Sequence, residues 1–383
     1  MKIIDVKGHI LRSPEKYLNP TASEEAPGVA YCFLLEVVTD EGITGWSDVE
    51  TEPHVAASVV SAPASGSEMI EGLREIVLGE DPFEVKRLWD KVYRGTIYYG
   101  RRGVAMQVLS GFDIALHDII GKATHKPVYK ILGGGYRDRV RAYASTLFRP
   151  TPDDIRRACD YYVSKGFTAI KFGWGVFGED RRRDIALVEA ARKAIGPNVD
   201  LMVDAGWKVN RSPYDAIELL RQLEDYNIYW LEDFLHPECY EGYRKVKEAG
   251  VKTRIAAGEQ EATGWGFHQL LKEGKIDVAQ PDLSRCGGFT QFNHIMWEAE
   301  LQGADVCPHA WLTDLLTAAS LHANAALPRS LFLEYNVSSS PMLRDVIANP
   351  VVLGADGMMD VPKGDGLGIE INVDAVKHYS VDL

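Results

Sequence analysis

The feature of this sequence that most restricts its fold is a regular alternation of short apolar segments with helical stretches after Gly133-Gly134-Gly135. The apolar segments are rich in β-branched residues, and from the second onward their ends lie 23 to 33 residues apart. Each interval accommodates one strand, one helix and their loops, the pattern of a parallel sheet wrapped by helices. The segments end at Ser145, Lys171, Asp204, Glu232, Glu259, Asp282, His309 and Glu334.

Eight parallel strands are the number that closes a (β/α) barrel, and about 200 residues suffice for one. We therefore predict an α/β fold with a (β/α)7β-type TIM barrel as the catalytic domain over residues 135–350. The last residues, 351–383, contain the extended segment GDGLGIEINVDAV. We expect this tail to return to the N-terminal region.

Residues 1–134 have a different pattern and are predicted to form an α+β capping domain together with the C-terminal tail. Apolar residues at every fourth position from Val104 to Ile120 predict an amphipathic helix. Asp40-Glu41-Gly42 separates two strand-like runs and is suited to a hairpin turn. The predicted strands are Lys2–Leu11, Tyr31–Thr39 and Thr44–Val49.

Composition excludes several classes of partner. The net charge of −13 argues against nucleic acid or an anionic membrane surface, because both need a basic face. The five cysteines are scattered and include no Cys-x-x-Cys pair, as expected of a reduced, cytoplasmic protein. The N-terminus lacks the apolar run of a signal peptide, and no apolar stretch reaches about 18 residues. We expect a soluble protein that acts on a small molecule.

Seven successive predicted strands, from the second to the eighth, finish on ionisable residues. In such barrels the active site lies at the carboxyl ends of the strands. A single acid at this position is more often a helix cap, and a single histidine is as often a hydrogen-bonded core residue. So many acids around one opening would repel one another unless a cation lay between them. Three acids on consecutive strands, Asp204, Glu232 and Glu259, offer the oxygen ligands that suit Mg²⁺.

Several short motifs recur in a characteristic order along nearly the whole chain. Those of the first region are DEGITGWSDVE and DIALHDIIGKATHKPVYKILGG. Those of the barrel are GFTAIKFGWG, VDAGW, WLEDFLHP, AAGE, QPDLSRCGG, CPHAW and LEYN. Together they resemble the enolase superfamily and, within it, the mandelate racemase-like subgroup. Any one motif is a weak signal, whereas their joint order and spacing are specific.

The resemblance implies an enzyme that removes the proton beside a substrate carboxylate. It implies that Asp204, Glu232 and Glu259 bind Mg²⁺ and that His309, paired with Asp282, is the general base. Glu334 would donate a hydrogen bond to the substrate carboxylate, and Lys171 would neutralise it. Metal and cations then stabilise the enediolate that forms. Related proteins often form symmetric assemblies, so we also expect a homo-oligomer.

One position departs from the pattern of the subgroup. The second strand commonly carries Lys-x-Lys, whose second lysine is a base on the face opposite the histidine. Here the match is Lys171-Phe172-Gly173, and glycine cannot accept a proton. One base suffices for dehydration of an acid sugar (an aldonate or aldarate) to a 2-keto-3-deoxy acid. His309 could then protonate the leaving hydroxyl, or a second acid such as His236 or Tyr17 could do so.

The resemblance places the far end of the substrate against loops of the first region. Candidate contacts are Lys16 and Tyr17 in the first loop, His54 in the second, and Arg101 or Arg102 before the long helix. A solvated surface side chain is an equally good interpretation of each.

Three alternatives remain open. A racemase or epimerase would need a second base in place of Gly173. A nicotinamide-dependent dehydrogenase is suggested by Gly173-Trp174-Gly175-Val176-Phe177-Gly178, a G-x-G-x-x-G pattern after a strand. However, its bulky residues would crowd a pyrophosphate, and Glu179-Asp180 would repel it. A non-catalytic sugar-acid-binding protein would need no His309–Asp282 pair.

Overall fold

The computed structural model describes residues 1–13, 31–207 and 211–381. Its N-terminal part contains an antiparallel sheet in the order β1 (Ile3–Arg12), β2 (Tyr31–Thr39) and β3 (Thr44–Val49). The predicted second and third strands are confirmed to the residue, and the first is displaced by one residue. Gly42 lies in the turn between β2 and β3 with φ +78°, a conformation that favours glycine.

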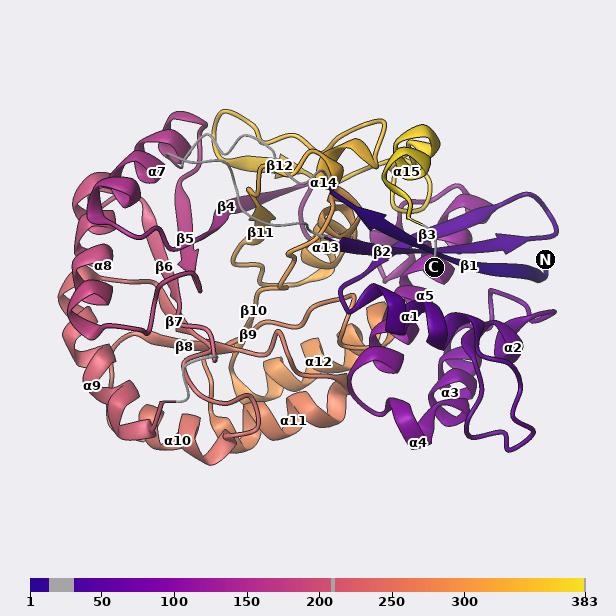
Figure 1. Ribbon diagram of the computed structural model, residues 1–383, viewed down its shortest axis with the longest axis horizontal. Helices are drawn as coiled ribbons and strands as arrows, with labels where there is room; N and C mark the ends of the chain where they lie inside the picture. The colour runs from indigo at the N-terminus through magenta and orange to yellow at the C-terminus, as the bar shows by residue number, and fades with distance from the viewer. Residues whose placement is uncertain (14–30, 208–210, 382–383) are drawn as a thin grey trace.

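Helices cover one side of this sheet (Figure 1). The predicted amphipathic helix is α5, and it buries Phe112 and Leu116 against strand residues such as Phe33. It is the one helix in the described ranges long and apolar enough to span a bilayer, and 83% of its most apolar window is buried inside the protein. The helices are α1 (Pro53–Ser61), α2 (Leu73–Val77), α3 (Val85–Gly95), α4 (Ile97–Gly100), α5 (Val104–Thr124) and α6 (Val128–Ile131).

The second part of the chain is a curled parallel sheet surrounded by helices, with the N-terminal sheet and helices at one side (Figure 1). Its strands follow the order β10-β9-β8-β7-β6-β5-β4-β11. A parallel bridge between Val306 and Ser330 joins the two ends of this order. The strands are β4 (Arg139–Leu147), β5 (Ala169–Gly173), β6 (Asp200–Asp204), β7 (Trp230–Glu232), β8 (Arg254–Ala257), β9 (Val278–Ala279), β10 (Asp305–Val306) and β11 (Leu333–Asn336).

Helices follow the strands along the chain and form the outer layer. Several begin with a side-chain cap. Thr151 caps α7 by accepting from the backbone of Asp154, and Asp180 caps α8 by accepting from that of Arg183. The helices are α7 (Pro152–Ser164), α8 (Arg181–Ile195), α9 (Pro213–Leu223), α10 (Tyr240–Glu248), α11 (Thr263–Gly274), α12 (Gly288–Gln302), α13 (Asp314–Ala326) and α14 (Met342–Asp345).

Three predicted strand ends were wrong, because the regular strands stop before the ionisable residue. β8 ends at Ala257, and Gly258 follows it with φ +126°, so Glu259 lies in a loop two residues past the end of the strand. Pro281 and Pro308 lack the backbone N–H that would continue the ladder, so β9 and β10 end before them. The two segments that follow β9 and β10 nevertheless stay in register, because Asp282 and His309 form an isolated parallel bridge. Conversely, β4, β5 and β11 each continue two residues past the predicted end.

The C-terminal tail contacts both parts of the molecule. β12 (Met358–Asp360) pairs antiparallel with β4, whereas α15 (Val373–Tyr379) lies beside the N-terminal sheet (Figure 1). There the backbone N–H of Val381 donates to Ile10 O at 2.9 Å. The expected return of the tail is therefore confirmed. The exact division into residues 1–134, 135–350 and 351–383 stays a prediction.

Large side chains fill the interior of the barrel beneath its carboxyl ends. Tyr143, Met202, Trp230 and Phe332 are buried there in one cluster. The rings of Tyr143, Trp230 and Phe332 meet edge to face, and the ring centroids of Trp230 and Phe332 are 5.9 Å apart. These side chains pack the interior of the barrel.

Candidate active site

Three carboxylates come together at the carboxyl ends of neighbouring strands. Asp204 ends β6, Glu232 ends β7, and Glu259 follows β8. One oxygen from each lies within 4.8 Å of the others, and all three side chains are buried. Asp204 accepts from the backbone N–H of Gly206 at 2.9 Å, and Glu232 accepts from the indole of Trp230 at 2.9 Å. These bonds fix the direction of the carboxylates.

This group fits a divalent cation by its chemistry. Burial and the nearby charge of Glu232 raise the pKa of Asp204 well above its usual value. Burial likewise raises the pKa of Glu232, although Lys171 opposes the shift. Buried carboxylates so close together are costly in ionised form unless a cation compensates them. Their oxygens are the hard ligands that Mg²⁺ prefers.

Lys171 is a buried residue of β5 that lies between two of the carboxylates at the ends of the other strands. Its Nζ is 2.7 Å from Glu232 Oε1 and 2.9 Å from Glu334 Oε1. Burial alone would lower the pKa of Lys171, but these two carboxylates raise it well above its usual value. Ser145 also donates to Glu334 Oε1 at 2.6 Å. Lys171 is therefore a fixed cation, in place to face a substrate carboxylate.

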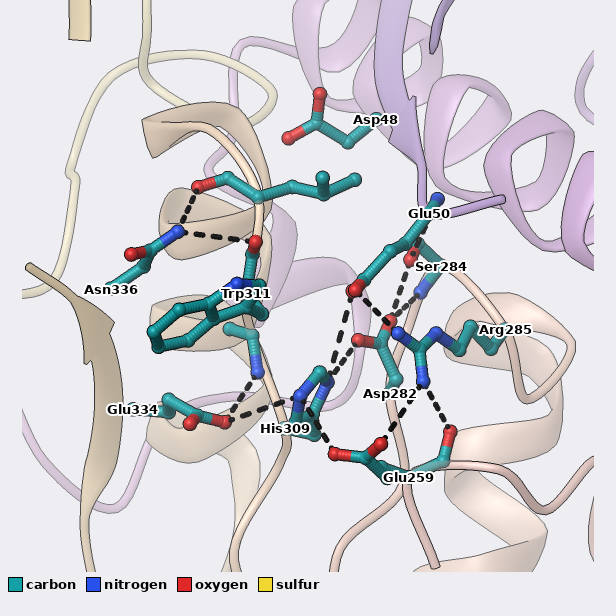
Figure 2. Close-up of polar contacts among 12 residues, drawn as sticks. Asp48, Glu50, Glu259, Asp282, Ser284, Arg285, His309, Trp311, Glu334 and Asn336 are labelled. Atoms are coloured by element: carbon teal, nitrogen blue, oxygen red, sulfur yellow. Dashed lines mark hydrogen bonds and ion pairs between the residues drawn. The ribbon is translucent and has the colours of Figure 1, made fainter. Parts of the chain in front are cut away.

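His309 and Asp282 form a buried pair on the loops after β10 and β9. His309 Nδ1 is 2.6 Å from Asp282 Oδ2, and the other Asp282 oxygen accepts from Ser284 N and Oγ. The carboxylate thus places a proton on Nδ1 and leaves Nε2 for chemistry. Nε2 lies 3.1 Å from Glu259 Oε2 and 3.8 Å from Glu334 Oε2 (Figure 2). Burial lowers the pKa of His309, whereas the surrounding carboxylates, Glu259 among them, raise it well above its usual value. A cation held by Glu259 would oppose that increase and favour the neutral ring that a base needs.

A cavity of about 400 Å³ opens above these groups. His309 and Asp204 reach it from different strands, and aromatic side chains form part of its wall. Glu232 and Asp282 lie beneath the surface of the cavity and are completely buried. The lining residues are Glu50, Ser145, Thr146, Leu147, Lys171, Gly173, Trp174, Asp204, Glu259, Gln260, Arg285, His309, Trp311 and Glu334.

Two charged cavity residues, Glu50 and Arg285, were not predicted. Glu50 comes from the end of β3 and forms an ion pair with Arg285 (Figure 2). Arg285 in turn donates to the backbone oxygen of Glu259 at 3.1 Å. Glu50 is the last residue of the DEGITGWSDVE motif and directly follows β3, whose sequence TGWSDV is not a continuous apolar run. The pattern that identified the barrel residues was therefore absent for Glu50.

Those predicted substrate contacts of the first region that the structure describes do not line this cavity. Lys16 and Tyr17 fall outside the described residues. His54 is about half exposed and 3.0 Å from Glu52. Arg101 and Arg102 line a second cavity of about 660 Å³ between α4 and α11, where Arg102 pairs with buried Glu261 at 3.6 Å. Their contact with a substrate stays a prediction.

His236, considered as a second acid, is exposed and has its ring 6.4 Å from that of Trp207. It is not among the residues that line the 400 Å³ cavity. A role for His236 as the acid also stays a prediction.

The G-x-G-x-x-G segment does not have the form of a dinucleotide loop. Phe177 is fully buried and stacks on Phe148 with ring centroids 4.6 Å apart. The N–H of Gly178 donates to the Asp184 carboxylate at 2.9 Å. An aromatic ring and a carboxylate thus stand where a pyrophosphate would need open backbone donors.

Comparison with known proteins agrees with this geometry. Residues 154–376 match the family model described as enolase C-terminal domain-like, and residues 16–133 match the N-terminal domain of mandelate racemase and muconate lactonizing enzyme. D-galactarolactone cycloisomerase of Agrobacterium fabrum is 33% identical over 99% of both chains. L-rhamnonate dehydratase of Saccharopolyspora erythraea is 29% identical over 96% of this chain and 90% of its own.

Solved structures show the same likeness. A racemase from Streptomyces coelicolor A3(2) with bound magnesium has a TM-score of 0.86 and 25% identity, over 99% of this chain and all of its own. The likeness therefore extends over both the N-terminal sheet and the barrel. This chain belongs to the enolase superfamily, in its mandelate racemase-like subgroup, and is an enzyme.

Proposed function

We propose that this enzyme is a magnesium-dependent dehydratase of an acid sugar, an aldonate or aldarate. It removes the proton α to the carboxylate and expels the β-hydroxyl, which gives a 2-keto-3-deoxy acid. The observation that carries this proposal is the His309–Asp282 pair at the cavity, with glycine at position 173, where a racemase of this subgroup needs a second base.

The roles follow from the contacts of each side chain. Asp204, Glu232 and Glu259 would hold Mg²⁺, which when bound supplies positive charge that stabilises the enediolate. His309 Nε2 accepts the α-proton, and Asp282 compensates the charge of the resulting imidazolium. Lys171 and Glu334 orient the substrate carboxylate. One oxyanion partner is typically worth about 2.7–4 kcal/mol of transition-state stabilisation.

The surroundings of Gly173 support a one-base mechanism. A Cβ at this position would lie 2.8 Å from Asp204 Oδ2 and 2.9 Å from Asp204 Cβ. Real Cβ atoms essentially never approach so closely, so a side chain here would displace Asp204. The second strand is thus closed to a second base by the packing of a proposed metal ligand.

The names of relatives support the substrate class. Besides L-rhamnonate dehydratase, they include D-xylonate, arabinonate and D-gluconate dehydratases, at 29 to 31% identity. A second candidate is ring opening of an acid-sugar lactone, favoured by the 33% identity with D-galactarolactone cycloisomerase. Where the lactone oxygen is on the β-carbon, the same proton removal would expel a carboxylate instead of a hydroxyl.

The direct test is to incubate the protein and Mg²⁺ separately with L-rhamnonate, D-xylonate, arabinonate, D-gluconate and D-galactarolactone. We expect a 2-keto-3-deoxy acid from at least one of the four open-chain acids. His309→Asn should reduce that rate by about 10²–10⁴-fold, the usual contribution of a positioned base. Ring opening of the lactone alone would favour the second candidate. Interconversion of C2 epimers without keto acid would replace both by a racemase or epimerase.

A further inference from the structure

Glu50 is the cavity residue that joins the N-terminal sheet to the catalytic end of the barrel. Of the described residues before position 134, it is the one that lines the 400 Å³ cavity. Its backbone N–H donates to Ser284 Oγ at 3.2 Å, beside Asp282. Its side chain is 15% exposed and points toward His309, between Trp311 and Arg285 (Figure 2).

The two carboxyl oxygens of Glu50 have different surroundings. Oε1 pairs with Arg285, whose guanidinium is itself bonded to the backbone of Glu259. Oε2 is buried, lacks a hydrogen-bond partner and lies 3.8 Å from His309 Nδ1. A buried carboxyl oxygen without a partner is costly in ionised form, which favours a proton on Glu50, and the Glu50 side chain itself lines the cavity.

The charges around Glu50 leave it able to carry a proton near neutral pH. Burial raises the pKa of Glu50 to about 7, although Arg285 and His309 act in the opposite direction. The nearby carboxylates of Asp282 and Glu259 add to the increase. A group whose pKa lies near the working pH is well suited to proton transfer.

We propose that Glu50 is the general acid that protonates the β-hydroxyl of the substrate as it leaves. This inference rests on the proposed dehydratase function and supplies the acid that its reaction requires. Glu50 stands beside His309, so the base and the acid act from the same side of the cavity.

The step balances in atoms and electrons. His309 Nε2 takes the C2 proton, and the electron pair of the C2–H bond passes into the enediolate. That pair then forms the C2–C3 double bond while the C3–O bond breaks toward oxygen. The proton of Glu50 Oε2 joins the departing oxygen and gives water. The enol ketonises to the 2-keto-3-deoxy acid, and the imidazolium and the Glu50 carboxylate exchange a proton with solvent to restore the starting state.

The test separates proton removal from loss of the hydroxyl. Glu50→Gln and the unmutated full chain are incubated with Mg²⁺ in deuterated water and with the acid sugar that the unmutated protein dehydrates fastest. For Glu50→Gln we expect keto-acid formation to fall by about 10²-fold or more. Recovered substrate should meanwhile gain deuterium at C2, because His309 still forms the enediolate and returns a solvent deuteron. Glu50→Asp keeps an acid at this position and should recover part of the dehydration rate.

Glu52→Gln is the matched control, because Glu52 lies two residues away, is about half exposed and caps α1. It should change neither keto-acid formation nor deuterium exchange. Dehydration at the unmutated rate by Glu50→Gln would overturn the inference. So would a parallel loss of exchange and dehydration, because this would mean that Glu50 only maintains His309. Failure of the unmutated protein to make keto acid would instead refute the proposed function.

Discussion

Gly173 shows how one residue can constrain both a mechanism and a metal site. It is the last residue of β5 and pairs in register with Asp204 of β6. Without a Cβ it lets the Asp204 carboxylate fold against the strand. A lysine introduced here to create a second base would meet Asp204 before it reached a substrate. The packing of Asp204 against β5 therefore requires glycine at the position where Lys-x-Lys has its second lysine.

At this scale we predict that Gly173→Ala weakens metal binding. The added Cβ would lie 2.8 Å from Asp204 Oδ2, so the carboxylate must move. We expect the dissociation constant for Mg²⁺, measured by isothermal titration calorimetry, to rise about tenfold or more, since about 1.4 kcal/mol of lost ligand interaction suffices. Gly274→Ala is the control, because its Cβ would have contacts no closer than 3.5 Å. Equal Mg²⁺ affinity in both variants would contradict the packing argument.

Among the elements, α13 connects the barrel to both ends of the chain. Asp48 of β3 accepts hydrogen bonds from Thr313 Oγ1 at 2.7 Å and from the backbone of Leu316 at 3.2 Å, at the start of the helix. Toward its end, His322 Nε2 donates to Leu367 O at 3.1 Å, and Nδ1 accepts from Tyr129 N–H at 3.4 Å. One helix thus fixes the N-terminal sheet, α6 and the C-terminal tail.

The contacts of His322 predict a pH-dependent stability. Burial lowers the pKa of His322 to about 4, and its two hydrogen bonds need a neutral ring. Because the folded pKa lies below the unfolded value of about 6.5, this contribution is complete above pH 6.5 and is lost as pH falls toward 4. From pH 7 to pH 5 the loss is about 2 kcal/mol. Urea unfolding should show that His322→Asn lacks this part of the decline.

The exposed His125 offers a matched control for this experiment. It follows the end of α5 and is 84% exposed, so His125→Asn should keep the slope of the unmutated protein. If His322→Asn and His125→Asn show the same dependence on pH, burial of His322 is not the cause.

Elements were predictable from the sequence where a local pattern determines them. The alternating runs gave β2 and β3 to the residue, and apolar residues at every fourth position gave α5. The ends of β9 and β10 were less accessible, because Pro281 and Pro308 stop the regular ladder while the backbone continues in register. Only the tertiary pairing of Asp282 with His309 shows where these strands meet.

Over the whole molecule, the barrel residues of the site were predictable and the contribution of the N-terminal sheet was not. A barrel brings the ends of its strands to one opening, so spacing alone suffices to place Asp204 near Lys171. Glu50 reaches His309 across 259 positions of chain, and no local period determines that contact. His54 and Arg102, which were predicted to contact the substrate, do not line this cavity. Their positions relative to the barrel also depend on tertiary contacts that no local sequence pattern determines.

The charge balance of the whole molecule leads to the last prediction. The chain carries a net charge of −13 and concentrates three buried carboxylates at the opening of its barrel. Without a cation these groups repel one another and lower the stability of the fold, whereas a bound cation adds stability by mass action. At a hundred times its dissociation constant, Mg²⁺ should add about 2.7 kcal/mol.

Asp204→Asn should therefore separate stability from function. It removes a buried carboxyl group that is costly to ionise and keeps an oxygen for the Gly206 N–H, so the metal-free protein should melt at a higher temperature than the unmutated one. The increase in melting temperature that Mg²⁺ gives the unmutated protein should disappear in the variant, and so should activity. Asp225→Asn, at an exposed acid outside the site, should alter neither response. An equal Mg²⁺-induced increase in Asp204→Asn and the unmutated protein, measured by differential scanning calorimetry, would mean that the cation binds elsewhere.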